Sequence, residues 1–321
     1  MTERERFIRT LRREPIGGRV PTFELVFYLT MEAFGKVHPD HRSYHQWKQM
    51  SRSEQELHIN DQADLFIDTA RRYHHSAIFV HANPHDMETQ RRVYEAIREK
   101  SGDEFFLMAH GDPTFSMPDG EHMMEFTEMM YDEPEKLIAQ AEANTEASIA
   151  RAEEYRKWGN LLDGFALCSD YCFNVNPFFT PTAFSELIAP FLKKAIDAYR
   201  DLGFYTIKHT DGNIMPIVDQ MVQCGPDALH SLDPQGGVDL AEVSRLYGDR
   251  VALIGNVNCG LLQTGSEEEC VADVRRALRD GMARGAGYIF STSNCAYTGL
   301  PLERYELMNK IWFEEGIYPE K

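Results

Sequence analysis

Short apolar runs alternate with longer amphipathic stretches along the whole chain. The runs are rich in β-branched and aromatic residues and are apolar at consecutive positions, which is typical of parallel strands buried on both faces. Each run is followed by helical signals, either an apolar face or a proline or glycine boundary. The pattern predicts eight strands, at residues 20–25, 77–80, 104–108, 161–167, from 205 onward, 228–232, 251–254 and 288–291.

Helices are predicted between these strands. The clearest are an N-terminal helix within residues 1–18, then 53–73, 84–99, 134–158, a helix through 184–192 that Pro190 should bend, and a last helix from Leu302. Eight β/α units in about 300 residues is the repeat count of a (β/α)8 TIM barrel. We therefore expect one TIM-barrel domain over residues 1–321, with an N-terminal helical extension. A doubly wound open sheet is the alternative.

Charge and composition exclude some functions. The chain has 33 basic and 51 acidic residues, for a formal charge of −18. Such a surface repels phosphate backbones and anionic lipids, so nucleic acid and membranes are not expected partners. We find no apolar run of about 18 residues and no signal peptide, and therefore expect a cytoplasmic protein. The six cysteines are too few for a disulfide scaffold and are expected to be free thiols.

Polar side chains that could carry chemistry follow the predicted strands. In a barrel of parallel strands these positions face one common opening, where barrel enzymes place their sites. Each residue alone could be a loop residue or a helix cap, so their number at one predicted rim is what indicates a site. They are Glu24, His81, Asp112, Asp170, His209, Asp211, Asp233, Asn256 and Cys295.

Several of these residues carry the nitrogen, sulfur and oxygen ligands that zinc prefers. His209 and Asp211 lie two positions apart at the end of a strand, so their side chains point to the same side. With Cys295 and Glu24 they make a candidate zinc site, although Cys259 is a rival thiol. A zinc ion with an open position could hold a substrate thiol as thiolate or polarise a substrate oxygen.

Five motifs resemble the uroporphyrinogen decarboxylase superfamily. They are residues 208–217 (KHTDGNIMPI), 225–229 (GPDAL), 255–258 (GNVN), 287–295 (GYIFSTSNC) and 301–305 (PLERY). The resemblance follows nearly the whole chain in element order and is most specific from Ser169 onward. It implies a (β/α)8 barrel. The superfamily includes the haem-pathway decarboxylases and the zinc-dependent methylcobamide methyltransferases.

The chain is more similar to the methyltransferase branch. The decarboxylases carry an arginine-rich N-terminal motif, and the corresponding stretch here has only Arg19. Their late histidine motif is replaced by residues 294–296 (NCA). The methyltransferases bind zinc with a His-x-Cys pair and a later cysteine. His209 and Cys295 match this pattern, but Asp211 stands where the middle cysteine is expected, which weakens the case for coenzyme M or homocysteine as acceptor.

The resemblance implies a corrinoid-linked, zinc-dependent methyltransferase. It would move a methyl group between a small methylated substrate or thiol and a corrinoid (cobalamin) carried by a partner protein. We expect His209, Cys295 and Glu24 as metal ligands, and Asp211, Asp170 and Asp233 as catalytic residues. His81, Asp112, Tyr171 and Asn256 are expected to bind substrate. The alternatives are a metal-free decarboxylase of the uroporphyrinogen type and a non-catalytic tetrapyrrole- or corrinoid-binding barrel.

Overall fold

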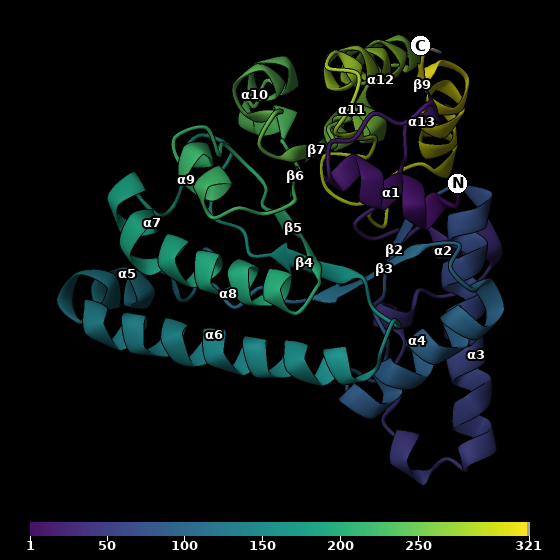
Figure 1. Cartoon of the computed structure of the whole chain (residues 1–321), viewed down its shortest axis with the longest axis horizontal. Coiled ribbons are helices and arrows are strands. Elements are labelled where there is room, and N and C mark those ends of the chain that lie inside the picture. The colour runs from purple at the N-terminus through teal and green to yellow at the C-terminus, as the bar shows by residue number, and fades with distance from the viewer. Residues whose placement is uncertain (320–321) are drawn as a thin grey trace.

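A curled parallel sheet forms the centre of the computed structural model, which describes residues 1–319 (Figure 1). The strands are β2 (Ala77–Phe79), β3 (Phe106–His110), β4 (Gly164–Cys168), β5 (Tyr205–His209), β6 (Ala228–His230), β7 (Ala252–Ile254) and β8 (Tyr288–Ile289). Neighbours in the chain are neighbours in the sheet, and every pair is parallel. All the strands therefore present their carboxyl ends at one edge.

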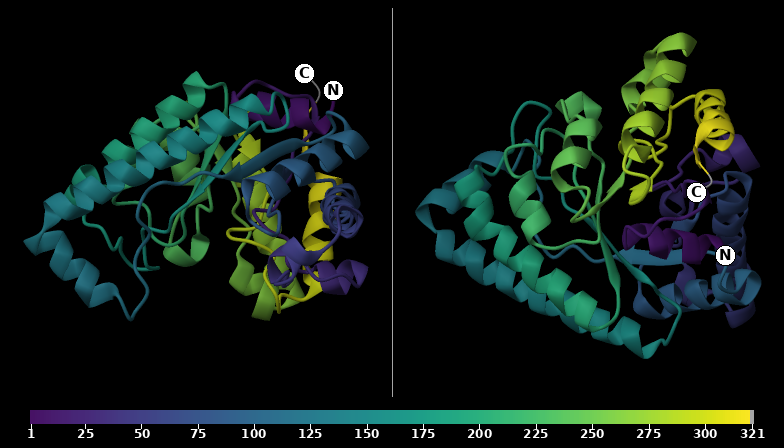
Figure 2. Two further views of the ribbon diagram at one scale, coloured as in Figure 1. Left: turned by 90° about the horizontal axis from the view of Figure 1, so that it is seen from below. Right: turned by 45° about the horizontal axis from the view of Figure 1, so that its top comes forward.

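Helices connect the strands and cover the outer face of the sheet. The α-helices are α1 (Glu3–Leu11), α2 (Thr30–Phe34), α3 (Arg52–Arg72), α4 (Met87–Ser101), α5 (Met123–Asp132), α6 (Pro134–Lys157), α7 (Pro181–Leu187), α8 (Ala189–Asp201), α9 (Val218–Gln223), α10 (Leu240–Tyr247), α11 (Cys259–Thr264), α12 (Glu267–Met282) and α13 (Leu302–Glu315). Short 3-10 helices are η1 (Pro39–His41), η2 (Trp47–Gln49) and η3 (Pro234–Gly236). In Figures 1 and 2 the α5–α6 hairpin extends to one side of the sheet, whereas α1 and α13 lie at the other side.

The first predicted strand is the main departure from expectation. Residues 20–25 form no regular strand, so seven parallel strands rather than eight are found in residues 1–319. Thr22 instead makes isolated parallel bridges to His75 beside β2 and to Phe290 beside β8. Pro21 has no N–H to donate, which limits how far a ladder can extend here. The short strand β1 (Gly18–Arg19) lies just before this segment and pairs antiparallel with β9 (Ile317–Tyr318).

A helix break replaces the predicted bend at Pro190. The chain leaves helical geometry at Ile188 (φ −119°, ψ −58°), so α7 ends at Leu187 and α8 begins at Ala189. Proline removes one backbone donor and its ring clashes with the preceding turn, which explains the break. The predicted helices at 53–73 and 134–158 and the last helix from Leu302 are confirmed to within two residues as α3, α6 and α13.

The inner face of the sheet is filled by apolar side chains. Ile207 of β5 and Ala228 of β6 belong to this inner core, and Phe7 of α1 joins it from the amino end of the strands. Because side chains alternate along a strand, His209 and His230, each two residues later, point to the same inner side at the carboxyl end. Within the described residues no helix is long and apolar enough to span a bilayer.

Candidate metal centre

Three side chains converge at the carboxyl ends of β4 and β5. Nε2 of His209 lies 3.8 Å from Oδ1 of Asp170 and 3.7 Å from Oδ1 of Asp211. One ligand atom from each residue lies within 4.8 Å of the other two, and among residues 1–319 this is the one group of three or more His, Cys, Asp or Glu side chains gathered so closely. The prediction that His209 and Asp211 point to the same side is confirmed.

Local backbone geometry places Asp211 over the site. Gly212 follows with φ +78°, and a Cβ atom at this position would lie 2.5 Å from the carbonyl oxygen of Phe173. Only glycine fits such a turn without a clash. The N–H of Asp211 also donates to Oδ1 of Asp170 at 3.0 Å, so the backbone of Asp211 orients the carboxylate of Asp170.

One carboxylate oxygen of Asp211 has no hydrogen-bond donor. Its Oδ2 accepts from Nδ2 of Asn294 at 2.5 Å, whereas Oδ1 is buried and has no hydrogen-bond partner. Burial, together with the negative charge of Asp170, raises the pKa of Asp211 to about 7. Keeping this carboxylate charged without a cation is therefore unfavourable.

His209 is buried, and its ring contacts a second imidazole, that of His230. Its Nδ1 lies 2.8 Å from Nδ1 of His230, and Nε2 of His230 lies 3.2 Å from the carbonyl oxygen of Thr292. Burial lowers the pKa of His209 to about 4 and also lowers that of His230 well below its usual value. Both rings are therefore neutral at pH 7, which is the form of histidine that binds metals.

The three residues fit a divalent cation. His209 Nε2 and the carboxylate oxygens are too far apart for direct hydrogen bonds, and the buried Oδ1 atom of Asp211 needs a positive partner. Zinc with nitrogen and oxygen ligands at about 2.0–2.2 Å places ligand atoms about 3.4 Å apart in a tetrahedral site, close to the separations found here. One imidazole and two carboxylates suit zinc and also harder divalent ions.

A sequence profile of the family described as "Uroporphyrinogen decarboxylase (URO-D)" matches residues 113–312, which include all three residues of this centre. The chain belongs to the uroporphyrinogen decarboxylase family. No curated protein sequence matches the chain.

One solved structure has a similar fold over nearly the whole chain. A methyltransferase from Methanosarcina mazei superposes with a TM-score of 0.72 at 17% identity, over 98% of this chain and 99% of that one. At this identity the likeness concerns the fold. A sugar phosphate isomerase/epimerase from Parabacteroides distasonis reaches a TM-score of 0.48 at 13% identity, over 80% and 92% of the two chains.

Two of the metal ligands predicted for this family member lie outside the three-residue cluster. Cys295 follows Asn294, whose amide binds Asp211, and burial raises the pKa of the Cys295 thiol to about 12. Glu24 is buried, and its two oxygens accept from the N–H (3.3 Å) and the hydroxyl (2.5 Å) of Thr292. Burial raises the pKa of Glu24 to about 8. Cys259 contacts the hydroxyl of Ser293 at 3.7 Å and is also outside the cluster.

Two predicted substrate-binding residues are enclosed behind the site. The carboxylate of Asp112 accepts from Nζ of Lys208 at 2.7 Å, and both side chains are fully buried. Although burial opposes it, the Lys208 charge lowers the pKa of Asp112. Tyr171 is also buried, with the Lys208 ammonium 4.1 Å from its ring centre. These groups brace the ends of β3, β4 and β5 and present no surface to a substrate.

The remaining predicted residues shape loops at the rim. Asp233 accepts from the N–H groups of Gly212 (3.3 Å) and Gln235 (2.9 Å), so it ties the turn after Asp211 to η3. Asn256 is fully buried and donates to the carbonyl of Leu232 at 2.6 Å. His81 is partly exposed at the carboxyl end of β2, where its ring packs on Phe79.

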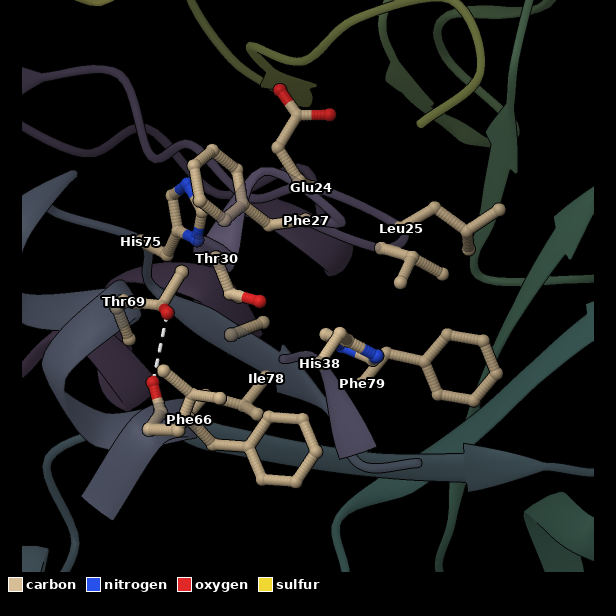
Figure 3. Close-up of a pocket in the computed structure, with 14 residues that line it drawn as sticks. Glu24, Leu25, Phe27, Thr30, His38, Phe66, Thr69, His75, Ile78 and Phe79 are labelled. Atoms are coloured by element: carbon tan, nitrogen blue, oxygen red, sulfur yellow. Dashed lines mark hydrogen bonds between the residues drawn. The ribbon is translucent and has the colours of Figure 1, made fainter. Parts of the chain in front are cut away.

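The cavity drawn in Figure 3 is separate from the metal centre. It lies between residues 24–30, helix α3 and strand β2, and its lining is mostly apolar. Glu24, Thr30 and His38 are among the polar side chains in its wall. The cavity adjoins residues 20–25, where the first predicted strand does not form. No member of the Asp170–His209–Asp211 cluster lines it.

Three supporting residues were not predicted from the sequence: His230, Asn294 and Lys208. In the structure Lys208 and His230 lie at or beside the carboxyl ends of β5 and β6, but residue 230 falls inside the predicted strand 228–232, so the strand-end signal did not single it out. Lys208 neighbours His209 in the strand and therefore points to the opposite face, which a period of two would have shown. The contact between His209 and His230 depends on the pairing of β5 with β6, in which these residues are direct partners.

Proposed function

We propose that this chain is a metal-dependent methyltransferase of its family. It would move a methyl group between a small methylated compound or thiol and a corrinoid carried by a partner protein. The observation that carries the proposal is the Asp170–His209–Asp211 cluster, in which an imidazole nitrogen and two carboxylates face one another at the mouth of the sheet. The fold match to a methyltransferase agrees with this proposal.

In this proposal Asp170, His209 and Asp211 hold one divalent ion, for which zinc is the first choice. A divalent ion there would act as a Lewis acid toward a sulfur, oxygen or nitrogen atom of the substrate. Oxygen ligands donate less charge than the thiolates of the methyltransferase branch, so the centre suits polarisation of a substrate atom better than strong activation of a thiolate. Asn294 orients Asp211, and the next residue, Cys295, is a neutral thiol that lies outside the three-residue cluster.

We also infer that the sheet closes as a (β/α)8 barrel in a single domain located in the cytoplasm. The support is Thr22, which bridges to both edges of the seven-stranded sheet, as a residue of a closing strand would. Backbone bonds from Ser76 to Thr22 and from Phe290 to Pro21 lie on either side of this segment.

A metal-free decarboxylase is the second candidate, favoured by one observation. With a pKa raised to about 7 by burial and by Asp170, Asp211 could donate a proton to a substrate carbon near neutral pH. Porphyrinogen carboxylates would require cationic partners. Arg19, from the stretch that carries arginines in the decarboxylases, is instead used elsewhere, because it donates to the carbonyl of Phe313 and stacks on that ring.

Incubation with methylcobalamin and a panel of small thiols, followed by the visible spectrum, tests the proposal. Metal-loaded protein should accelerate loss of methylcobalamin with at least one acceptor, and His209→Ala should not. His122→Ala, which changes an exposed histidine just before α5, is the matched control and should behave as wild type. Carbon dioxide release from uroporphyrinogen with no methyl transfer would favour the decarboxylase, and neither activity would favour a binding protein.

A further inference from the structure

His230 is a buried histidine that touches the metal centre without being part of it. It is 1% exposed, and its hydrogen-bonding neighbours are His209, Thr292 and Ser291. No carboxylate is among these partners. A ring enclosed in this way stays neutral and carries one N–H, so its two nitrogens have different roles.

The direction of the hydrogen bonds follows from the carbonyl of Thr292. A carbonyl oxygen only accepts, so the N–H of His230 lies on Nε2 and donates to Thr292 at 3.2 Å. Ser291 Oγ lies 3.5 Å from the same nitrogen and can donate or accept, so the carbonyl decides. Nδ1 of His230 then carries the lone pair, and Nδ1 of His209, 2.8 Å away, must be the donor.

This direction determines the free nitrogen of His209. With its single proton on Nδ1, His209 carries a lone pair on Nε2, the atom that lies 3.7 Å from Asp211 and 3.8 Å from Asp170. We propose that His230 is a positioning residue that fixes the tautomer and ring orientation of His209, so that Nε2 is the nitrogen offered to a metal. The inference rests on the proposed metal site, and it concerns how this chain prepares that site before an ion arrives.

The support continues one residue further. The carbonyl that receives the His230 proton belongs to Thr292, whose N–H and hydroxyl are both held by Glu24. One continuous chain of contacts therefore runs from Glu24 through Thr292 and His230 to His209 at the end of β5. Removal of a residue that hydrogen-bonds to a metal ligand commonly weakens metal affinity by about 10- to 100-fold.

Two variants separate positioning from folding. His230→Phe keeps a flat ring but removes both hydrogen bonds, whereas in His230→Gln the side-chain amide can donate to Thr292 and accept from His209. We expect the Zn²⁺ dissociation constant, measured by competition with a chromophoric chelator, to rise about 10- to 100-fold in His230→Phe. His230→Gln should recover much of this loss. In a His209→Ala background, His230→Phe should cause no further loss, because the nitrogen it positions is absent.

Nitrogen NMR of the metal-free protein gives a readout that a purely structural role would not move. In ¹⁵N-histidine-labelled wild type, Nε2 of His209 should be unprotonated and Nδ1 protonated, and in His230→Phe this preference should be lost. A wild-type His209 protonated at Nε2, or a folded His230→Phe that binds Zn²⁺ as tightly as wild type, would overturn the inference. If wild type binds no metal but shows the expected tautomer, the proposed function fails and the positioning role stands.

Discussion

Nε2 of His209 and Oδ1 of Asp211 lie 3.7 Å apart, two positions along the chain, and both are acceptors. Two lone pairs facing each other in a buried setting are unfavourable unless a proton or a cation lies between them. Without an ion, a proton on Asp211 removes the charge of this carboxylate, in keeping with its pKa of about 7. With an ion the proton is released, so metal binding and the titration of Asp211 are linked.

The metal-free protein should lose stability as pH rises through this titration. The folded-state pKa of Asp211, about 7, is above the unfolded value of about 3.9, so the protonated folded form is favoured. The contribution of Asp211 is fully present below about pH 4 and is lost as pH rises to about 7, with an upper limit of about 4 kcal/mol. Urea unfolding in chelator at pH 5 and pH 8 measures it.

Asp211→Asn is the control for that titration. The amide cannot ionise, so the variant should lose less unfolding free energy between pH 5 and pH 8 than wild type does. Other titrating groups, including Glu24, are present in both proteins and cancel in the difference. Identical pH dependence in the two proteins would show that Asp211 does not titrate in this range.

Removing the buried ammonium beside Asp112 should destabilise the protein strongly. Lys208→Met leaves the fully buried carboxylate of Asp112 without its charge partner, and loss of one member of such a pair costs about 3–5 kcal/mol. Lys193→Met, which breaks the exposed pair with Asp197 on α8, should cost no more than about 0.5 kcal/mol. Chemical denaturation of the two variants compares the costs, and equal losses would contradict the assignment of Asp112 to the scaffold.

Glu24→Gln distinguishes a metal ligand from a support residue. Glutamine can keep contacts to Thr292 but is a much poorer ligand for a divalent ion. Because burial raises the pKa of Glu24 to about 8, the neutral amide also resembles the wild-type side chain at pH 7. We expect the Zn²⁺ affinity at pH 7 to change less than about threefold, well short of the 10- to 100-fold expected for lost supporting contacts. Loss of bound metal would restore Glu24 as a ligand.

Much of the fold could be predicted because it is encoded by local patterns. Seven of the eight predicted strands are present, and long amphipathic helices such as α3 and α6 begin and end close to their predicted positions. The segment around Thr22 was predicted as a strand because its composition favours one, and its reduction to single bridges depends on its pairing with two distant edges as well as on Pro21.

The candidate site was predictable where it depends on spacing within one strand. His209 and Asp211 are two residues apart, and their convergence follows from the pleat of the chain. The contact between His209 and His230 depends on register between strands, and the enclosure of Asp112 depends on Lys208 pointing behind the sheet. Neither relationship can be predicted from the spacing of residues within a single segment, because each joins two separate segments.

Metal analysis of purified wild-type protein, alongside His209→Ala and Asp211→Asn, tests the central claim most directly. After loading with Zn²⁺ and removal of free ion, wild type and the His122→Ala control should retain about one ion per chain, and the two site variants should retain far less. A folded wild-type protein that binds no divalent ion, or variants that keep the wild-type content, would contradict the account of this centre.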